Sequence, residues 1–200
     1  QKQTEIAASE ALSNLAAPQL MGSGRGDSAE TYLKVVATYP KSRAAGRALL
    51  LAAGKLFEEG KYAEAHTQFE RFTREYADSS FRGQALLGMA ACLDAQGKSN
   101  EAATAYKNLI DRYPTDPVLP QARFALARLY AAQNKPELAR NLLEEVERNN
   151  PYGSLGAEAG MRLEELKIKY PQLAAPPTPS APLAPTTPTP TNAPLQPQKR

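Results

Sequence analysis

The sequence predicts an all-α fold, in which antiparallel helix pairs stack in a row and a proline-rich tail follows them. Three observations predict this architecture. A Tyr or Asn followed by Pro or Ala recurs every 37 residues, at Tyr39, Tyr76, Tyr113 and Asn150. Alanine supplies much of the 42% hydrophobic content, which suits close packing of helices. From Pro171 onward the composition changes abruptly to Pro, Thr, Ala and Gln.

The N-terminal residues 1–40 are expected to form one helix and a degenerate first repeat. Helical periodicity runs through residues 2–16, and the glycine-rich run after them indicates a flexible loop. A second helix is predicted at 28–39. Asp27 or Ser28 can cap it, because a short polar side chain accepts hydrogen bonds from the free N–H groups of a helix start.

Three complete units follow, at residues 41–77, 78–114 and 115–151. In each unit the periodicity predicts two antiparallel helices of about 15–19 residues. The turns between them contain Gly60, Gly97 and Asn134, residue types that adopt the left-handed conformation which ends a helix. One such pair cannot bury its own apolar faces, whereas stacked pairs can.

Alignment of the three units by the 37-residue period gives columns of small and of large apolar residues, which we predict to be the core. The small columns are Ala48, Ala85 and Ala122; Ala53, Ala90 and Ala127; and Ala65, Ala102 and Ala139. The large columns are Leu56, Leu93 and Tyr130; Phe69, Tyr106 and Leu143; and Phe72, Leu109 and Val146.

The C-terminal end is predicted to contain a capping helix within residues 152–170 and a disordered Pro/Thr/Ala-rich tail at 171–200. The capping helix has one apolar stripe and is otherwise charged, as the end of a repeat array requires. The tail cannot bury enough apolar surface to fold and favours extended polyproline structure. Its PxxP spacing at Pro176, Pro179 and Pro182 matches ligands of aromatic grooves, but the composition favours a linker or spacer.

The order of small, aromatic and Ala positions before a Pro resembles the tetratricopeptide repeat, which implies a right-handed superhelix of helix pairs. The period here is 37 residues, against about 34 in the usual repeat. The aromatic that usually starts the first helix is replaced by Leu49, Leu86 and Arg123. The Tyr-Pro-x-Ser type of connector resembles a bacterial envelope branch of these repeats. That branch comprises YfgM-like Sec translocon subunits, BamD-like assembly lipoproteins and CpoB-like cell-division coordinators.

The resemblance also implies a binding site, because the first helices of tetratricopeptide repeats line a concave groove. The positions that match the groove are Arg47, Gln84 and Gln121; Leu50, Leu87 and Phe124; Gly54, Ala91 and Arg128; and Phe57, Asp94 and Ala131. An apolar row beside polar rows can receive the apolar face of a peptide, and arginines can bind its carboxylates. The alternative is that the apolar row packs against the N-terminal helix or the cap.

Composition argues against other classes of function. The single His66 and the single Cys92 leave no set of residues for a zinc site or a nucleophile with its base, so no enzyme, cofactor or metal is expected. The net charge of +3 comes from interspersed charges without a basic stripe, which argues against nucleic acid.

The sequence thus predicts a non-enzymatic scaffold that binds a protein or peptide, with a translocon subunit or an envelope chaperone as the partner that the resemblance implies. The alternatives are a self-associating spacer and an adaptor in outer-membrane assembly or cell division. The expected location is the periplasmic side of a bacterial envelope, with the cytoplasm as alternative. Because the chain starts at Gln1, we expect any membrane anchor in a segment before it.

Overall fold

The computed structural model describes residues 2–20 and 28–174, and every regular element in these two ranges is helical. The elements are α1 (Lys2–Leu20), α2 (Ala29–Thr38), α3 (Arg43–Glu58), α4 (Tyr62–Glu75), α5 (Arg82–Ala95), α6 (Ser99–Arg112), α7 (Leu119–Ala132), α8 (Pro136–Asn149), α9 (Ser154–Lys169) and a short 3₁₀ helix, η1 (Pro171–Ala174). The all-α prediction is confirmed for the described part of the chain. No helix in that part is long and apolar enough to cross a membrane.

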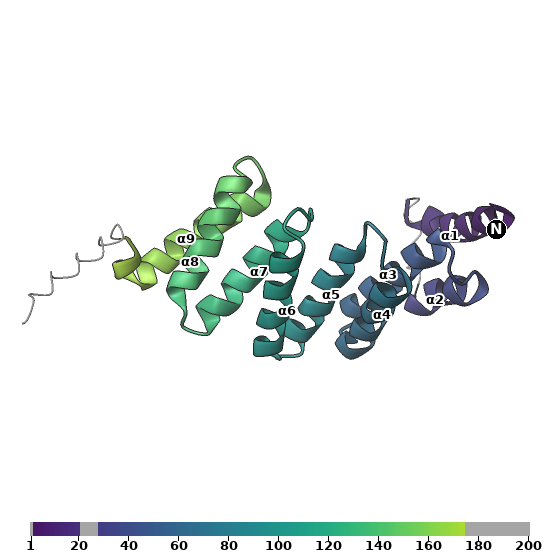
Figure 1. Cartoon of the computed structure of the whole chain (residues 1–200), viewed down its shortest axis with the longest axis horizontal. Helices are drawn as coiled ribbons and strands as arrows, with labels where there is room; N and C mark the ends of the chain where they lie inside the picture. The colour runs from purple at the N-terminus through teal and green to yellow at the C-terminus, as the bar shows by residue number, and fades with distance from the viewer. Residues whose placement is uncertain (1, 21–27, 175–200) are drawn as a thin grey trace, which may run out of the picture.

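The helices follow one another along the long axis of the molecule, from α1 at one end to α9 at the other (Figure 1). Each helix packs against the next one in the chain. In addition, α1 contacts α3, α3 contacts α5, and α7 contacts α9. The odd-numbered helices therefore form one layer, and we call its exposed side the first-helix face.

Of the paired helices, α3 falls within the predicted length of about 15–19 residues, and the others fall just below it. Helices α4 to α8 have 14 residues each, and α3 has 16. Gly60, Gly97 and Asn134 have φ values of 76°, 75° and 54°, which confirms the left-handed turns. The residue after each turn residue donates its N–H to the carbonyl of Leu56, Leu93 or Tyr130, a bond that closes the end of the first helix.

The predicted alanine columns are the contact surfaces between helices. All nine alanines have an exposed fraction of 0%. The large residues of the second helices are buried as well, with exposed fractions of 1–8% for Phe69, Tyr106, Leu143, Phe72, Leu109 and Val146. Leu56 is buried, while Leu93 and Tyr130 are half-buried. The aligned columns therefore identified the core.

Two glycines mark places where an aromatic ring touches the backbone of a neighbouring helix. A Cβ atom on Gly88 of α5 would lie 2.5 Å from the ring of Phe69, which comes from α4 of the preceding unit. A Cβ atom on Gly46 of α3 would lie 3.0 Å from the ring of Tyr76. Since Tyr76 follows α4, this contact lies within its own unit.

The N-terminal part is joined to the array by α1. The carboxylate of Glu5 accepts the backbone N–H of Arg43 at 3.1 and 3.2 Å, so a side chain of α1 satisfies the first turn of α3. Ser42 also caps α3, accepting the Ala45 N–H at 3.0 Å. Ser28 precedes α2 as predicted but makes no side-chain cap bond, and the glycine-rich loop with Asp27 lies outside the described residues.

The predicted boundary between folded chain and tail is wrong by four residues. Residues 171–174 form η1, in which Leu173 is only 5% exposed and packs with α8 and α9. Arg140 of α8 donates from Nη1 to the Leu173 carbonyl at 3.4 Å. The single Leu in a Pro-Gln-Leu-Ala sequence is enough to hold this turn, because α9 leaves an apolar edge open beside α8. Residues 175–200 lie outside the described part.

Replacement of Ala90 by Leu should destabilise the fold by about 1–3 kcal/mol, because a contact with no exposed surface cannot take three more carbons. Urea denaturation followed by circular dichroism measures this. Ala95→Leu is the matched control, since Ala95 is exposed at the end of the same helix. Equal stability of the two variants would contradict the assignment of Ala90 to a close helix contact.

The thiol of Cys92 should be unreactive in the folded chain. It is completely buried, and burial raises the pKa of the Cys92 thiol to about 11. Since the unfolded thiol ionises near pH 8.5, its contribution to stability is present below that pH and is lost as the pH rises toward 11. An aromatic disulfide reagent at pH 8 should label Ala95→Cys at once and leave Cys92 unlabelled until urea unfolds the protein. Fast labelling of the native chain would contradict the burial.

Candidate functional site

The predicted groove residues lie along the first-helix face, on α3, α5 and α7. Arg47, Gln84 and Gln121 are exposed. Leu50, Leu87 and Phe124 are half-buried, and each packs against a different hydrophobic cluster of the array. Each side chain of the apolar row therefore supports the core and leaves part of its surface exposed, and its contact with a partner stays a prediction.

The charged members of the groove are joined to each other. Arg128 of α7 forms an ion pair with Asp94 of α5, at 2.5 Å between Nη2 and Oδ2. The Asp94 side chain is 17% exposed, while that of Arg128 is 67% exposed. This pair links two successive first helices across the groove and occupies the arginine that the sequence assigned to a partner.

The remaining predicted positions differ in role. Phe57 is half-buried and lies edge-on against Tyr62, with ring centroids 5.1 Å apart, so it closes the turn between α3 and α4. Arg47 borders a hollow of about 440 Å³ between α3 and α1, together with Glu5, Ile6 and Leu51. The N-terminal helix α1 thus lies beside the α3 end of the first-helix face. This agrees with the alternative that part of the apolar row packs against the N-terminal helix.

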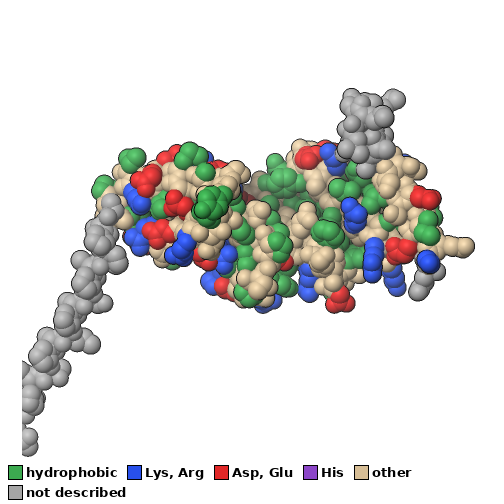
Figure 2. All heavy atoms as spheres, turned by 90° about the horizontal axis from the view of Figure 1, so that it is seen from above, with side chains coloured by type: hydrophobic (Ala, Val, Ile, Leu, Met, Phe, Trp, Pro, Cys, Tyr) green, Lys and Arg blue, Asp and Glu red, His purple; other side chains and the backbone are tan. Residues whose placement is uncertain are grey.

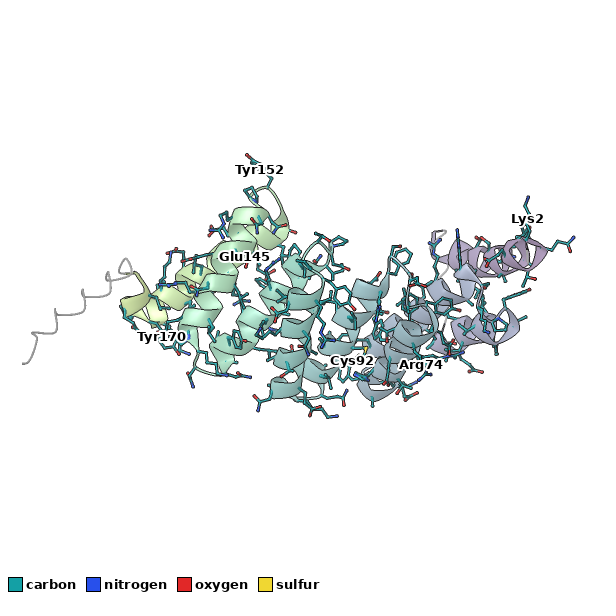
Figure 3. All side chains as sticks on the ribbon, viewed as in Figure 1. Lys2, Arg74, Cys92, Glu145, Tyr152 and Tyr170 are labelled. Carbon is teal, nitrogen blue, oxygen red and sulfur yellow. The ribbon has the colours of Figure 1, made fainter. Side chains whose placement is uncertain are left out.

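A pocket of about 360 Å³ opens at the other end of the first-helix face, between α7 and α9. Its floor is apolar and comes from Phe124, Ala127 and Ala131 of α7, Leu143 of α8 and Leu166 of α9. Its rim is charged and contains Arg128, Glu158, Arg162, Glu165 and Lys169. Tyr170, labelled at the C-terminal end of the array in Figure 3, closes one side.

Two of the pocket's residues continue columns of the predicted groove beyond residue 151. Glu158 follows Gln121 by 37 residues, and Glu165 follows Arg128 by the same interval. Met161 likewise follows Phe124; it is 62% exposed and is not part of the pocket lining. Extension of the period into the capping helix would have found these positions, because α9 is the first helix of an incomplete fourth pair.

Charges on the visible surface alternate in sign. Figure 2 shows blue and red side chains interspersed with green ones and no extended basic area on that face. Within residues 2–20 and 28–174, no three His, Cys, Asp or Glu side chains are grouped to hold a metal ion. His66 is half-buried on α4, away from the pocket, and Cys92 is sealed in the core. The described residues thus form an apolar pocket with a charged rim.

Similar solved structures share this arrangement of helices. PcrH from Pseudomonas aeruginosa matches with a TM-score of 0.56 and 18% identity, covering 63% of this chain and 94% of that one. The type III secretion chaperone SycD from Yersinia enterocolitica, solved with a peptide of the translocator YopD, matches with a TM-score of 0.55 and 21% identity over 65% and 98%. A putative kinesin light chain from Podospora anserina with TPR-like repeats matches with a TM-score of 0.57 and 16% identity over 86% and 87%.

At these identities the likeness shows the fold alone, and no curated protein matches the sequence. The sequence itself matches the family model described as tetratricopeptide repeat twice, at residues 50–117 and 87–154. Together the two matches span more than half of the 200 residues and include α4 to α8 in full. The chain therefore belongs to the tetratricopeptide repeat family.

Proposed function

We propose that this protein is a non-enzymatic scaffold that binds a protein or peptide partner on its first-helix face, the concave side expected for these repeats. The observation that carries the proposal is the pocket between α7 and α9, with its apolar floor and charged rim. Its volume of about 360 Å³ falls in the range of ligand pockets, which combine an apolar lining with a few polar groups that orient the ligand.

The partner's contact is a bulky apolar side chain flanked by polar backbone or side chains. Phe124, Leu143 and Leu166 offer only apolar atoms in their side chains, so an apolar group gains most from entering. The charged side chains of the rim stay in contact with water when the ligand binds, so little free energy is lost in desolvating them. They orient the ligand residues on either side of the apolar side chain. An enzyme would need a nucleophile or an acid–base pair in this pocket, and its lining has only ion-paired or isolated charges.

Two of the similar structures support a peptide as the ligand class. PcrH was solved with the chaperone-binding region of PopD, and SycD was solved with a peptide of YopD. Both share the fold of this chain, with TM-scores of 0.52 and 0.55, so this architecture is able to hold a peptide. Which partner binds the present chain has to come from experiment.

A place in the bacterial envelope, near the Sec translocon, an outer-membrane assembly machine or the division apparatus, is part of the proposal. It is supported by the Tyr-Pro-x-Ser type of connector and by nothing in the geometry of the pocket. Fractionation of the intact gene product decides between the periplasmic side and the cytoplasm, because a cytoplasmic protein would be released with the soluble markers of that compartment.

Affinity capture from the native cells should lose its specific partner when Leu50, Leu87 and Phe124 are all changed to alanine. We expect about a tenfold or greater loss of affinity, since central apolar contacts dominate binding energy. The control is Leu138→Ala, which removes a 46% exposed side chain from α8, outside the pocket lining. Circular dichroism must show that both variants fold.

Because the three residues also support the core, a second variant separates binding from stability. Ala131→Lys places a cation on the pocket floor at a half-buried position in the last turn of α7, where a positive charge suits the helix end. Full capture by a folded Ala131→Lys protein would move the binding site away from the pocket.

Self-association is the second candidate function, and two exposed apolar residues of α9 favour it. Met161 and Ile168 lie two turns apart on this helix and are 62% and 80% exposed. Light scattering over a range of concentrations should show mass rising with concentration if these residues join two chains. Met161→Lys with Ile168→Lys should then restore the monomer. A constant mass in the native chain would exclude this candidate.

A further inference from the structure

The charges around the α7–α9 pocket are unequally satisfied. Arg128 pairs with Asp94, and Arg162 pairs with Glu165 at 3.0 Å. The ammonium group of Lys169 lies over the ring of Tyr170, 5.3 Å from its centroid. Glu158 and Lys169, at opposite ends of the pocket, have no ion pair among the described residues, so the rim keeps one available charge of each sign. A ligand of this pocket is therefore apolar in its middle, and a basic group suits only the Glu158 end.

The sequence that directly follows η1 has this composition. Residues 175–200 contain nine prolines and no Asp or Glu, and their only charged side chains are Lys199 and Arg200. In a polyproline helix, which has three residues per turn, the prolines of the run Pro176-x-x-Pro179-x-x-Pro182-x-x-Pro185 line one edge. Such edges bind to grooves lined by aromatic side chains, and this pocket contains Phe124 and Tyr170.

The geometry of the attachment allows the contact within one chain. Leu173 is fixed against α8 and α9, and Tyr170 already forms part of the pocket, so residue 175 starts close to it. From Lys169 to Glu158 the pocket follows α9 for about 16 Å, at about 1.5 Å per residue. Five or six residues at about 3.1 Å each span that length in polyproline form. The residues that follow must fold back for Lys199 and Arg200 to reach Glu158.

We propose that residues 175–200 are a ligand of the α7–α9 pocket in the same chain, with the proline run on Phe124 and Tyr170 and the basic end near Glu158. This inference rests on the proposed function, because it assigns a resident occupant to the same site. The tether supplies an effective concentration on the order of millimolar, so even a weak contact fills the pocket. A partner then has to displace the segment, which gives the scaffold a built-in threshold for binding.

A synthetic peptide of residues 175–200 with a fluorescent label tests the contact, and anisotropy measures its binding. One target is the native chain. The other is a chain of equal length in which residues 175–200 are replaced by a Gly/Ser sequence, so that the pocket has no resident ligand. We expect the peptide to bind the Gly/Ser variant roughly tenfold more tightly than the native chain, because the native segment competes at millimolar effective concentration.

Variants of the Gly/Ser chain locate the site. Ala131→Lys should abolish peptide binding, because it places a charged side chain in the apolar floor that the proline run is proposed to contact. Ala95→Lys is the matched control at an exposed position near the end of α5, and it should leave binding unchanged. Glu158→Lys should weaken binding mainly at low salt, where exposed charges interact over longer distances. It replaces Ala131→Lys as the deciding variant if that protein fails to fold.

The inference is overturned if the peptide does not bind the Gly/Ser variant, if it binds the native chain equally well, or if the deciding pocket variant leaves binding unchanged. Partner capture, repeated with the Gly/Ser chain, keeps the two proposals apart. If Ala131→Lys abolishes partner capture but the peptide does not bind, the proposed function stands. Only the proposal of a resident ligand is then rejected. Peptide binding without partner capture would support the resident ligand and remove the proposed partner from this pocket.

Discussion

The contact of helix backbones at alanine is the constraint on which the rest of this structure depends. Nine alanines in three columns have no exposed surface, and each lies where two helices meet. Only a small side chain lets the helices approach so closely, and the large residues of the second helices then fill the space on either side. Because the same columns recur every 37 residues, each pair repeats the geometry of the pair before it, and the first helices are brought into one layer.

This constraint also explains why the pocket lies at the C-terminal end. In α9 the positions that follow Ala127 and Tyr130 by 37 residues are Glu164 and Lys167, which form an ion pair at 2.8 Å. A second helix cannot pack on such a surface, so the array stops there. Among the described residues no helix pair follows α9, and the apolar floor beside Phe124 is open, whereas the equivalent space between α5 and α7 is bridged by Asp94 and Arg128.

A resident proline-rich ligand would fit the energetics of such an open end. An apolar hollow that faces water is unfavourable, and a tethered segment can cover it without ordering a second molecule. The affinity of the segment for the pocket must remain low, because a partner has to displace it. Short polyproline contacts meet that requirement, since they bury little surface and their extended form loses little entropy on binding.

The sequence by itself determined the helical class, the repeat period, the alanine contacts and the left-handed turns at Gly60, Gly97 and Asn134. These features depend on local conformation and on side-chain size at fixed intervals, and both are visible in one aligned period. Only the tertiary structure decided that Arg128 is bound to Asp94, that Tyr76 packs in its own unit and that Leu173 extends the fold past Pro171. It also decided that Glu158 and Glu165 share a pocket with Phe124. Each of these contacts joins residues from different helices, whose distance depends on how the pairs pack and not on any local pattern.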